Sequence, residues 1–288
     1  MKKKILSALL VGAMVSSLLA GCGGSDSAST SDNSTSAGSS DAQTTEQGSS
    51  DATAEASGIE GKTVAFIPKL TGNAFFEVAN DGAQEYAEKW GITVDYMGSS
   101  NAAVADQVSV INQAISSGVD AICISTVDAA GVSDALQEAK DAGIPVIIVD
   151  RMVDVSDDSL YTAWVGSNFK LEGQKAMAWL DAYLEAKGRG DEEINLVDIQ
   201  GTIGASAQIG RTEGFDEAVE AHDNWTTLAQ QSGEFTQAKG QEVMESILKQ
   251  SGDDIDVVYC ENDNEAFGAI DAIKAAGYEV GGEEGQIL

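Results

Sequence analysis

The stretch VAFIPKLTGNAFFEVANDGAQEYAEKWG, residues 64–91, joins a short apolar segment to a longer mixed segment through a turn. Residues 64–68 have the β-branched and aromatic composition of a buried strand. From Phe75 to Trp90 the apolar residues recur at helical spacing, and Gly91 stands where a helix would end. The stretch therefore predicts a strand, a turn and a helix, and the turn region contains Lys69, Asn73, Phe75 and Phe76.

The same alternation of strand-like and helix-like segments continues along the chain. Strands are predicted at residues 63–68, 92–97, 119–125, 144–150, 161–167, 194–200, 226–231 and 255–261. Helices are predicted at residues 75–90, 102–117, 129–142, 168–186, 205–221, 235–250 and 263–276, with ends at Gly91, Gly118, Gly143 and Gly277. Repeated strand–helix units predict an α/β fold with parallel sheets covered by helices on both faces.

Polar side chains follow the predicted strands at the edge where ligands of such sheets bind. They are Lys69, Ser125, Thr126, Asp128, Asp150, Arg151, Ser167, Asn168, Gln200, Asn262 and Asp263. Aromatic rings can cover the C–H face of a sugar, and planar Asp, Asn and Arg side chains can engage its hydroxyl rim. The rings available for this are Phe75, Phe76, Phe169 and Phe235. The combination favours a sugar ligand.

Each of these residues also has a structural interpretation. Phe76 and Phe169 could pack in the core, and Asn262 could cap the following helix. Asp150 and Arg151 could form a structural ion pair, and Arg211 could be a solvent-facing arginine of a helix.

The N-terminal segment MKKKILSALLVGAMVSSLLAGC has a cationic start, a short apolar run and small residues before Cys22, which predicts a secretory signal. The LLAGC sequence resembles the lipobox of bacterial lipoproteins. Residues 1–21 are therefore expected to be a lipoprotein signal peptide and Cys22 to be lipidated. Residues 22–60, rich in Ser, Thr and Asp, are expected to form a disordered tether. The expected location is the outer face of the bacterial cytoplasmic membrane, at the cell surface or in the periplasm.

The composition argues against several functions. A formal net charge of −31 disfavours nucleic-acid binding. The single histidine, His222, leaves almost no material for a histidine catalyst or a zinc site, so no metal is expected. No glycine-rich nucleotide motif or nucleophile elbow follows a predicted strand, which predicts a protein that is not an enzyme and needs no cofactor. Cys123 and Cys260 are expected to be small buried hydrophobic residues, with a disulfide left open.

Six segments together resemble the sugar-binding proteins of ABC importers with the type 1 periplasmic-binding fold, in particular the ribose- and galactofuranose-binding members. They are NAFFEVANDGAQEYAEKWG, GVDAICIS, AGIPVIIVDR, IQGTIGASAQIGRTEGF, QSGEFTQAKGQEVMES and NDNEAFGAIDAIKAAG. The resemblance runs from about Thr63 to the last residue. It implies two doubly wound, Rossmann-like lobes joined by a hinge, an N-terminal lobe at 61–166 and a C-terminal lobe at 167–288. Because these relatives continue beyond the position of Leu288, the C-terminal part of the fold is expected to be missing.

The resemblance also implies a binding site and a function. The implied ligand-binding residues are Asn73, Phe75, Phe76, Asp150, Arg151, Arg211, Phe235 and Asn262, with Ser125 and Ser167 as further candidates. Lys69 matches rhamnose-type and autoinducer-2 binders, in which the lysine can face the ligand; otherwise its head would lie in water at the surface. The implied function is capture of a monosaccharide, a furanose or a pentose or hexose, for an ABC permease. The alternative is a receptor for autoinducer-2 or a sugar signal that reports to a sensor. The lipid anchor is expected to be the only membrane contact.

Overall fold

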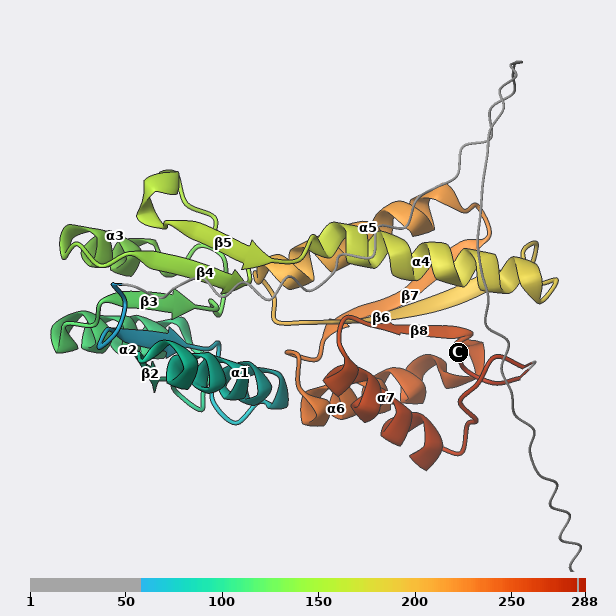
Figure 1. Ribbon diagram of the computed structural model, residues 1–288. Coiled ribbons are helices and arrows are strands. Elements are labelled where there is room, and N and C mark those ends of the chain that lie inside the picture. The colour runs from blue at the N-terminus through green and yellow to red at the C-terminus, as the bar shows by residue number, and fades with distance from the viewer. Residues whose placement is uncertain (1–57, 284) are drawn as a thin grey trace, which may run out of the picture. The chain divides into compact units, whose positions relative to one another are not determined.

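The computed structural model describes residues 58–283 and 285–288 (Figure 1). The predicted signal peptide, the lipidation of Cys22 and the tether up to residue 57 lie outside the described residues. Within the described part of the chain, no helix combines the length and the hydropathy needed to cross a bilayer.

Strands and helices alternate through the described residues as the sequence predicts, except that the fifth strand follows the fourth without an α-helix between them. The strands are β1 (Thr63–Ile67), β2 (Thr93–Tyr96), β3 (Ala121–Ile124), β4 (Val146–Asp150), β5 (Ala163–Gly166), β6 (Ile194–Gln200), β7 (Trp225–Ser232) and β8 (Val257–Cys260). The helices are α1 (Ala74–Trp90), α2 (Val104–Ser117), α3 (Ser133–Asp141), α4 (Phe169–Ala186), α5 (Ser206–Ala221), α6 (Gln237–Ser251) and α7 (Asp263–Ala275). Short 3-10 helices lie at Asp158–Leu160 and Gly252–Asp254.

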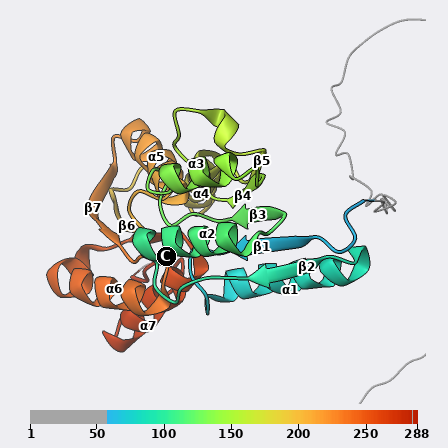
Figure 2. The same cartoon turned by 90° about the vertical axis from the view of Figure 1, so that its left-hand side faces the viewer.

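The first sheet is parallel and has the strand order β2-β1-β3-β4-β5. Right-handed crossovers place α1 on one face and α2 and α3 on the other, because the chain first moves one way along the sheet and then back. Figure 2 shows this division. On the α2 and α3 side, Ile67, Ile122 and Ile148 from three neighbouring strands pack against Ile111 and Leu136. This core fixes where the carboxyl ends of β1, β3 and β4 lie.

The second sheet is also parallel and has the order β7-β6-β8. Alternate residues of β6 face opposite sides of the sheet. Leu196 packs in the cluster that contains Leu180 of α4, whereas Ile199 packs in the cluster that contains Met244 of α6. Helices therefore cover both faces of this sheet, as the α/β prediction requires.

Two predicted helix starts were wrong. Residues 129–132 are not helical, because Asp128 Oδ1 accepts hydrogen bonds from the amides of Ala130 and Gly131, at 3.0 and 2.6 Å, and holds a turn. Helix α6 begins at Gln237 rather than Phe235, because Glu234 and Phe235 both have positive φ, 57° and 59°. The four predicted helix ends are confirmed by positive φ at Gly91, Gly118, Gly143 and Gly277.

Both described cysteines are free. Cys123 in β3 and Cys260 in β8 belong to different sheets and are half-buried. Burial raises the pKa of the Cys123 thiol, which disfavours the reactive thiolate.

Candidate functional site

A cavity of about 670 Å³ lies where the carboxyl ends of the strands in both sheets meet the first turns of α1, α5 and α7. This volume falls within the range of small-molecule sites. Its lining contains nine of the eleven residues that the sequence proposed as ligand contacts: Lys69, Asn73, Phe75, Phe76, Asp150, Arg151, Arg211, Phe235 and Asn262. The topology thus brings together residues that are almost 200 positions apart.

Asp150, the last residue of β4, has a strained backbone. Its φ of 63° lies in the left-handed region, which is uncommon for a residue with a side chain. Its Oδ2 accepts a weak hydrogen bond from Ser125 Oγ at 3.4 Å and lies 3.9 Å from Arg151 Nε. Burial raises the pKa of Asp150, although the Arg151 and Arg211 charges oppose that rise. The carboxylate therefore lies in the cavity with most of its hydrogen-bonding capacity unused.

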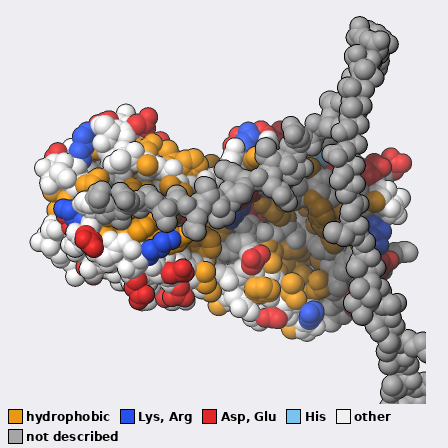
Figure 3. All heavy atoms as spheres, in the orientation of Figure 1, with side chains coloured by type: hydrophobic (Ala, Val, Ile, Leu, Met, Phe, Trp, Pro, Cys, Tyr) orange, Lys and Arg blue, Asp and Glu red, His pale blue; other side chains and the backbone are white. Residues whose placement is uncertain are grey.

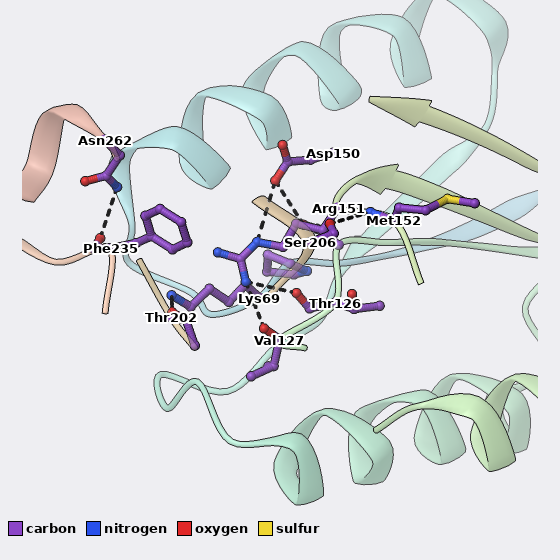
Figure 4. Close-up of polar contacts among 12 residues, drawn as sticks. Lys69, Thr126, Val127, Asp150, Arg151, Met152, Thr202, Ser206, Phe235 and Asn262 are labelled. Carbon is purple, nitrogen blue, oxygen red and sulfur yellow. Dashed lines mark hydrogen bonds and ion pairs between the residues drawn. The ribbon is translucent and has the colours of Figure 1, made fainter. Parts of the chain in front are cut away.

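Arg151 is buried, with 4% of its surface exposed. Its Nη1 donates to the carbonyls of Thr126 and Val127 at 3.1 and 2.9 Å, as Figure 4 shows. Its Nε is buried and has no hydrogen-bond partner among the described residues. The guanidinium carbon lies 5.0 Å from the centre of the Phe235 ring. Burial lowers the pKa of Arg151 to about 10, so the side chain is cationic at neutral pH. The ion pair with Asp150 exists, but carbonyl groups hold the guanidinium in place.

Lys69 follows β1 and is 3% exposed, so the alternative of a surface lysine with its head in water is wrong. Its Nζ donates to Thr202 Oγ1 at 2.7 Å and to the Glu234 carbonyl at 3.0 Å (Figure 4). It also lies 5.2 Å from the centre of the Phe235 ring. Burial and the Arg151 charge lower the pKa of Lys69 to about 7. A lysine in this state can donate to a ligand without a full unpaired charge.

Arg211 of α5 is not the solvent-facing arginine of the structural interpretation. Its Nε and Nη2 donate to Glu172 Oε2 at 3.0 and 2.8 Å, and its Nη1 donates to the Glu261 carbonyl at 2.6 Å. The guanidinium carbon lies 5.1 Å from the Phe169 ring centre and 5.9 Å from the Phe235 ring centre. These contacts hold the Arg211 side chain, which projects from α5, against the wall of the cavity.

Close packing of α4 on α5 determines how far Arg211 reaches. A Cβ atom at Gly173 of α4 would lie 2.5 Å from the Arg211 carbonyl oxygen, and one at Gly214 of α5 would lie 2.6 Å from the Lys170 carbonyl oxygen. Real Cβ atoms do not approach backbone this closely, so only glycine permits the observed separation of the two helices.

Phe235 lies at the centre of the site and is buried. Its positive φ places the ring against Gly201, where any side chain would collide with it. Its backbone amide donates to Glu265 Oε1 at 2.8 Å. Cations from three chain segments, Lys69, Arg151 and Arg211, surround the ring, which is a favourable arrangement for an aromatic quadrupole.

The remaining lining residues combine structural and cavity-facing roles. Asn73 Oδ1 accepts from the Phe75 amide at 3.1 Å and caps α1, and Asn262 Oδ1 accepts from the Glu265 amide at 2.9 Å and caps α7. Phe76 is buried, and its ring meets the exposed Phe75 ring edge to face at 5.1 Å between centres. The capping interpretation of Asn262 and the packing interpretation of Phe76 are therefore confirmed, and both residues also line the cavity.

Two candidates lie outside the cavity lining. Ser125 is buried beneath Asp150, and Ser167 is exposed between β5 and α4. Asp263, which the sequence placed at this edge of the strands, also lines the cavity, whereas sequence reasoning missed Ala74, Val78, Ala79, Ala207, Asn264 and Phe267. Ala74 and Val78 are four residues apart in α1, and Asn264 and Phe267 are three residues apart in α7, so each pair shares one helix face, which could have indicated their position. Within the described residues, no group of three His, Cys, Asp or Glu side chains is arranged to hold a metal ion.

Comparison with known proteins gives a consistent result. A family model described as "Periplasmic binding protein domain" matches residues 64–285. The galactofuranose-binding protein YtfQ of Escherichia coli is 42% identical over 201 residues, which are 69% of this chain and 61% of the relative. The ribose import binding protein RbsB of Salmonella typhimurium is 32% identical over 225 residues, 78% of this chain and 72% of the relative. A crystal structure of a galactofuranose binding protein is 39% identical, with a TM-score of 0.71 over 76% of this chain and 72% of that one.

These relatives carry sugar names, so the autoinducer or sensor alternative has less support than sugar binding. The chain spans only part of their fold, 61% of the length in the case of YtfQ. A family match over residues 64–285 covers most of the sequence. The chain therefore belongs to the periplasmic binding protein domain family, whose members are binding proteins.

Proposed function

We propose that this protein captures a monosaccharide outside the cytoplasm and delivers it to an ABC-type permease, without making or breaking a bond in the sugar. The observation that carries the proposal is the cavity in which aromatic rings and planar polar groups meet. Phe75 and Phe235 would cover the ring face of the sugar. Asp150, Arg151 and Asn262 would engage its hydroxyl groups.

The adjacent Asp150 and Arg151 side chains suit neighbouring hydroxyls of one sugar. The carboxylate accepts hydrogen bonds, and the guanidinium donates them. Arg151 Nη1 is bonded to two backbone carbonyls and Nε is buried, so Nη2 would be the nitrogen that donates to a sugar hydroxyl. Ser125 would act indirectly, by orienting Asp150.

We infer that the two lobes, residues 61–166 and 167–288, move about the β5–α4 connection. A sugar that contacts both lobes only in the closed arrangement would shift the population toward that arrangement. The cavity lining supports this inference, because Asp150 and Arg151 belong to the first segment and Arg211, Phe235 and Asn262 to the second. The N-terminal sequence supports export and lipid anchoring at Cys22, which would keep the protein near a permease.

A thermal-shift panel of monosaccharides on the purified protein tests the proposal. A ligand present at 100 times its Kd and bound only by the native state adds about 2.7 kcal/mol to the unfolding free energy. For a chain of this size each kcal/mol raises Tm by roughly 2 to 4 °C, so the expected shift is about 5 to 10 °C.

Phe75→Ala should abolish most of this shift with little effect on the unliganded Tm, because Phe75 lines the cavity but is exposed. Tyr86→Ala is the matched control, since Tyr86 is an exposed aromatic residue of the same helix outside the cavity. The proposal fails if no monosaccharide raises Tm, or if a bound sugar is converted to another product.

A further inference from the structure

Lys69 connects the two proposed lobes. It follows β1, in the first lobe, whereas both acceptors of its hydrogen bonds belong to the second lobe. These acceptors are Thr202 Oγ1 at 2.7 Å and the Glu234 carbonyl at 3.0 Å (Figure 4). Lys69 is thus a side chain of one lobe that is held by groups of the other.

Two backbone amides of the first lobe also reach the loop between β6 and α5. The Ala129 amide donates to the Gly204 carbonyl at 3.1 Å. The Met152 amide donates to Ser206 Oγ at 2.8 Å. The proposed lobes are therefore in direct contact in this structure, and Lys69 is the titratable group at that contact.

The amine of Lys69 is enclosed by groups from both lobes. Lys69 is 3% exposed and is the only buried lysine among the described residues. Figure 3 shows other Lys and Arg side chains scattered over the visible surface, in reach of water. The centre of the Phe235 ring, from the second lobe, lies 5.2 Å from Lys69 Nζ. Separation of the lobes would remove this ring and both acceptors from the amine and expose it to water.

The hydrogen bonds of Lys69 suit a neutral amine. Its two acceptors among the described residues match the two N–H groups of the neutral form, and both are uncharged oxygens. The ammonium form has three N–H groups. In the closed arrangement the third N–H group would be buried without an acceptor from these contacts, which disfavours the ammonium.

The charged groups around Lys69 act in the same direction. Burial, and then the Arg151 charge, lower the pKa of Lys69 to about 7, against the raising effects of Glu265 and Glu234. Burial raises the pKa of Glu265 to about 9, so this acid of α7 carries no charge at neutral pH to balance an ammonium. Arg211 of α5 adds a second guanidinium to the lining of the same cavity.

We propose that sugar capture releases a proton from Lys69, which is an ammonium in water when the lobes are open and a neutral amine held by Thr202 and Glu234 when they close. On closure one N–H bond breaks, its electron pair stays on Nζ, and the proton passes to water or buffer. Lys69 is thus a positioning residue that acts through lobe closure. This inference rests on the proposed function and adds regulation by pH to the same site.

The sign and size of the effect follow from the two protonation states. The open form binds more protons than the closed form between about pH 7 and pH 10.5, so the affinity for sugar rises with pH. With these two values for the closed and open forms, closure releases about 0.1 of a proton at pH 6 and about 0.9 at pH 8. The affinity should therefore increase about tenfold from pH 6 to pH 8.

Isothermal titration at pH 6 and pH 8 measures the affinity, and titration in two buffers of different ionisation enthalpy counts the protons released. The probe is the monosaccharide that raises Tm most in the panel, with D-ribose and D-galactose tested first. Lys69→Met keeps the length of the side chain but has no proton to release, so the release at pH 8 and the tenfold change should both disappear. Lys175→Met, at an exposed lysine of α4 outside the cavity lining, is the matched control and should keep both.

The possible outcomes separate this inference from the proposed function. The proton count on the parent protein needs no variant, and sugar binding without proton release at pH 8 would overturn the inference while leaving sugar capture in place. In that case the ammonium would persist in the complex. Release that persists in Lys69→Met would also overturn the inference, because the proton would then come from Asp150 or Glu261, whose pKa values are raised by burial. If no monosaccharide of the panel binds, both proposals are wrong.

Discussion

The buried acid Glu265 provides a quantitative test of the structure through the dependence of stability on pH. Its side chain is fully buried at the start of α7. Oε1 accepts the Phe235 amide at 2.8 Å, while Oε2 has no hydrogen-bond partner among the described residues. Burial raises the pKa of Glu265 to about 9, and the nearby Glu261 and Asp198 carboxyls raise it further, against the lowering effect of the Phe235 amide and Lys69. Glu265 is therefore protonated in the folded protein at neutral pH.

The sign of the effect follows from proton counts. In the unfolded chain the carboxyl ionises near its ordinary pKa of 4.5, whereas in the folded chain it keeps its proton up to about pH 9. Between these values the unfolded state binds fewer protons, so the unfolding free energy decreases as pH rises. The stabilising contribution of the protonated Glu265 side chain to the unfolding free energy is fully present below pH 4.5 and is lost progressively up to about pH 9. One proton corresponds to about 1.4 kcal/mol per pH unit, or about 4 kcal/mol between pH 5 and pH 8.

Glu265→Gln should remove this dependence. The amide has the same shape, its Oε1 can still accept the Phe235 hydrogen bond, and it has no proton to lose in this range. Urea unfolding monitored by tryptophan fluorescence at pH 5, 6, 7 and 8 measures the difference between variant and parent, which should grow in favour of the variant by about 4 kcal/mol across the range. Glu85→Gln, an exposed glutamate of α1, is the control. Parallel pH profiles for the parent and Glu265→Gln would refute the buried, protonated assignment.

Three other perturbations have expected outcomes. Asp198 is buried and its pKa is raised to about 8, so Asp198→Asn should also stabilise the protein increasingly from pH 4 to pH 8. Urea unfolding measures this effect, and a difference in unfolding free energy between variant and parent that stays constant with pH would contradict it. Burial lowers the pKa of Lys69 to about 7, below its ordinary value of 10.5. The contribution of neutral Lys69 to the unfolding free energy is therefore fully present above pH 10.5 and is lost as pH falls through 7. A 13C-labelled lysine signal that titrates near pH 7 and disappears in Lys69→Met would confirm the lowered pKa of Lys69, whereas titration of that signal near pH 10.5 would contradict it. Gly201→Ala places a methyl group in the Phe235 ring and should cost about 1–3 kcal/mol of stability and weaken sugar binding. Gly82→Ala, in open space on α1, should be neutral or stabilising by up to about 1 kcal/mol, and equal effects of the two alanines on stability would contradict the packing around Phe235.

Local sequence patterns were sufficient to predict the elements of the fold. The apolar runs and helical spacings gave every described strand and helix of β1–β8 and α1–α7 to within a few residues. The largest errors occurred at the starts of α3 and α6, where side-chain and backbone geometry decide the boundary. Asp128 holds a turn before α3, and the left-handed conformation of Phe235 delays α6. Neither feature leaves a periodic signal in the sequence.

The candidate site was predictable in its residue types and less so in its electrostatics. Residues that follow strands, such as Asp150 and Asn262, could be placed at the cavity because parallel strands share one carboxyl edge. The burial of Lys69 could not be predicted from the sequence, because its partners Thr202 and Glu234 lie more than 130 positions away in sequence. The same limit applies to Arg211, since its contact with Glu172 depends on how α5 packs on α4.

Under the proposed function, the glycine contact between α4 and α5 would influence ligand affinity from a place outside the cavity. Arg211 reaches the cavity only as far as the spacing of the two helix axes allows, and Gly173 and Gly214 determine that spacing. A methyl group added at Gly173 or Gly214 would shift the Arg211 backbone, and with it the guanidinium in the cavity lining, while every cavity residue stayed the same. Variation among natural sequences at these two glycines should therefore track differences in sugar preference, and a survey confined to cavity-lining positions would miss it.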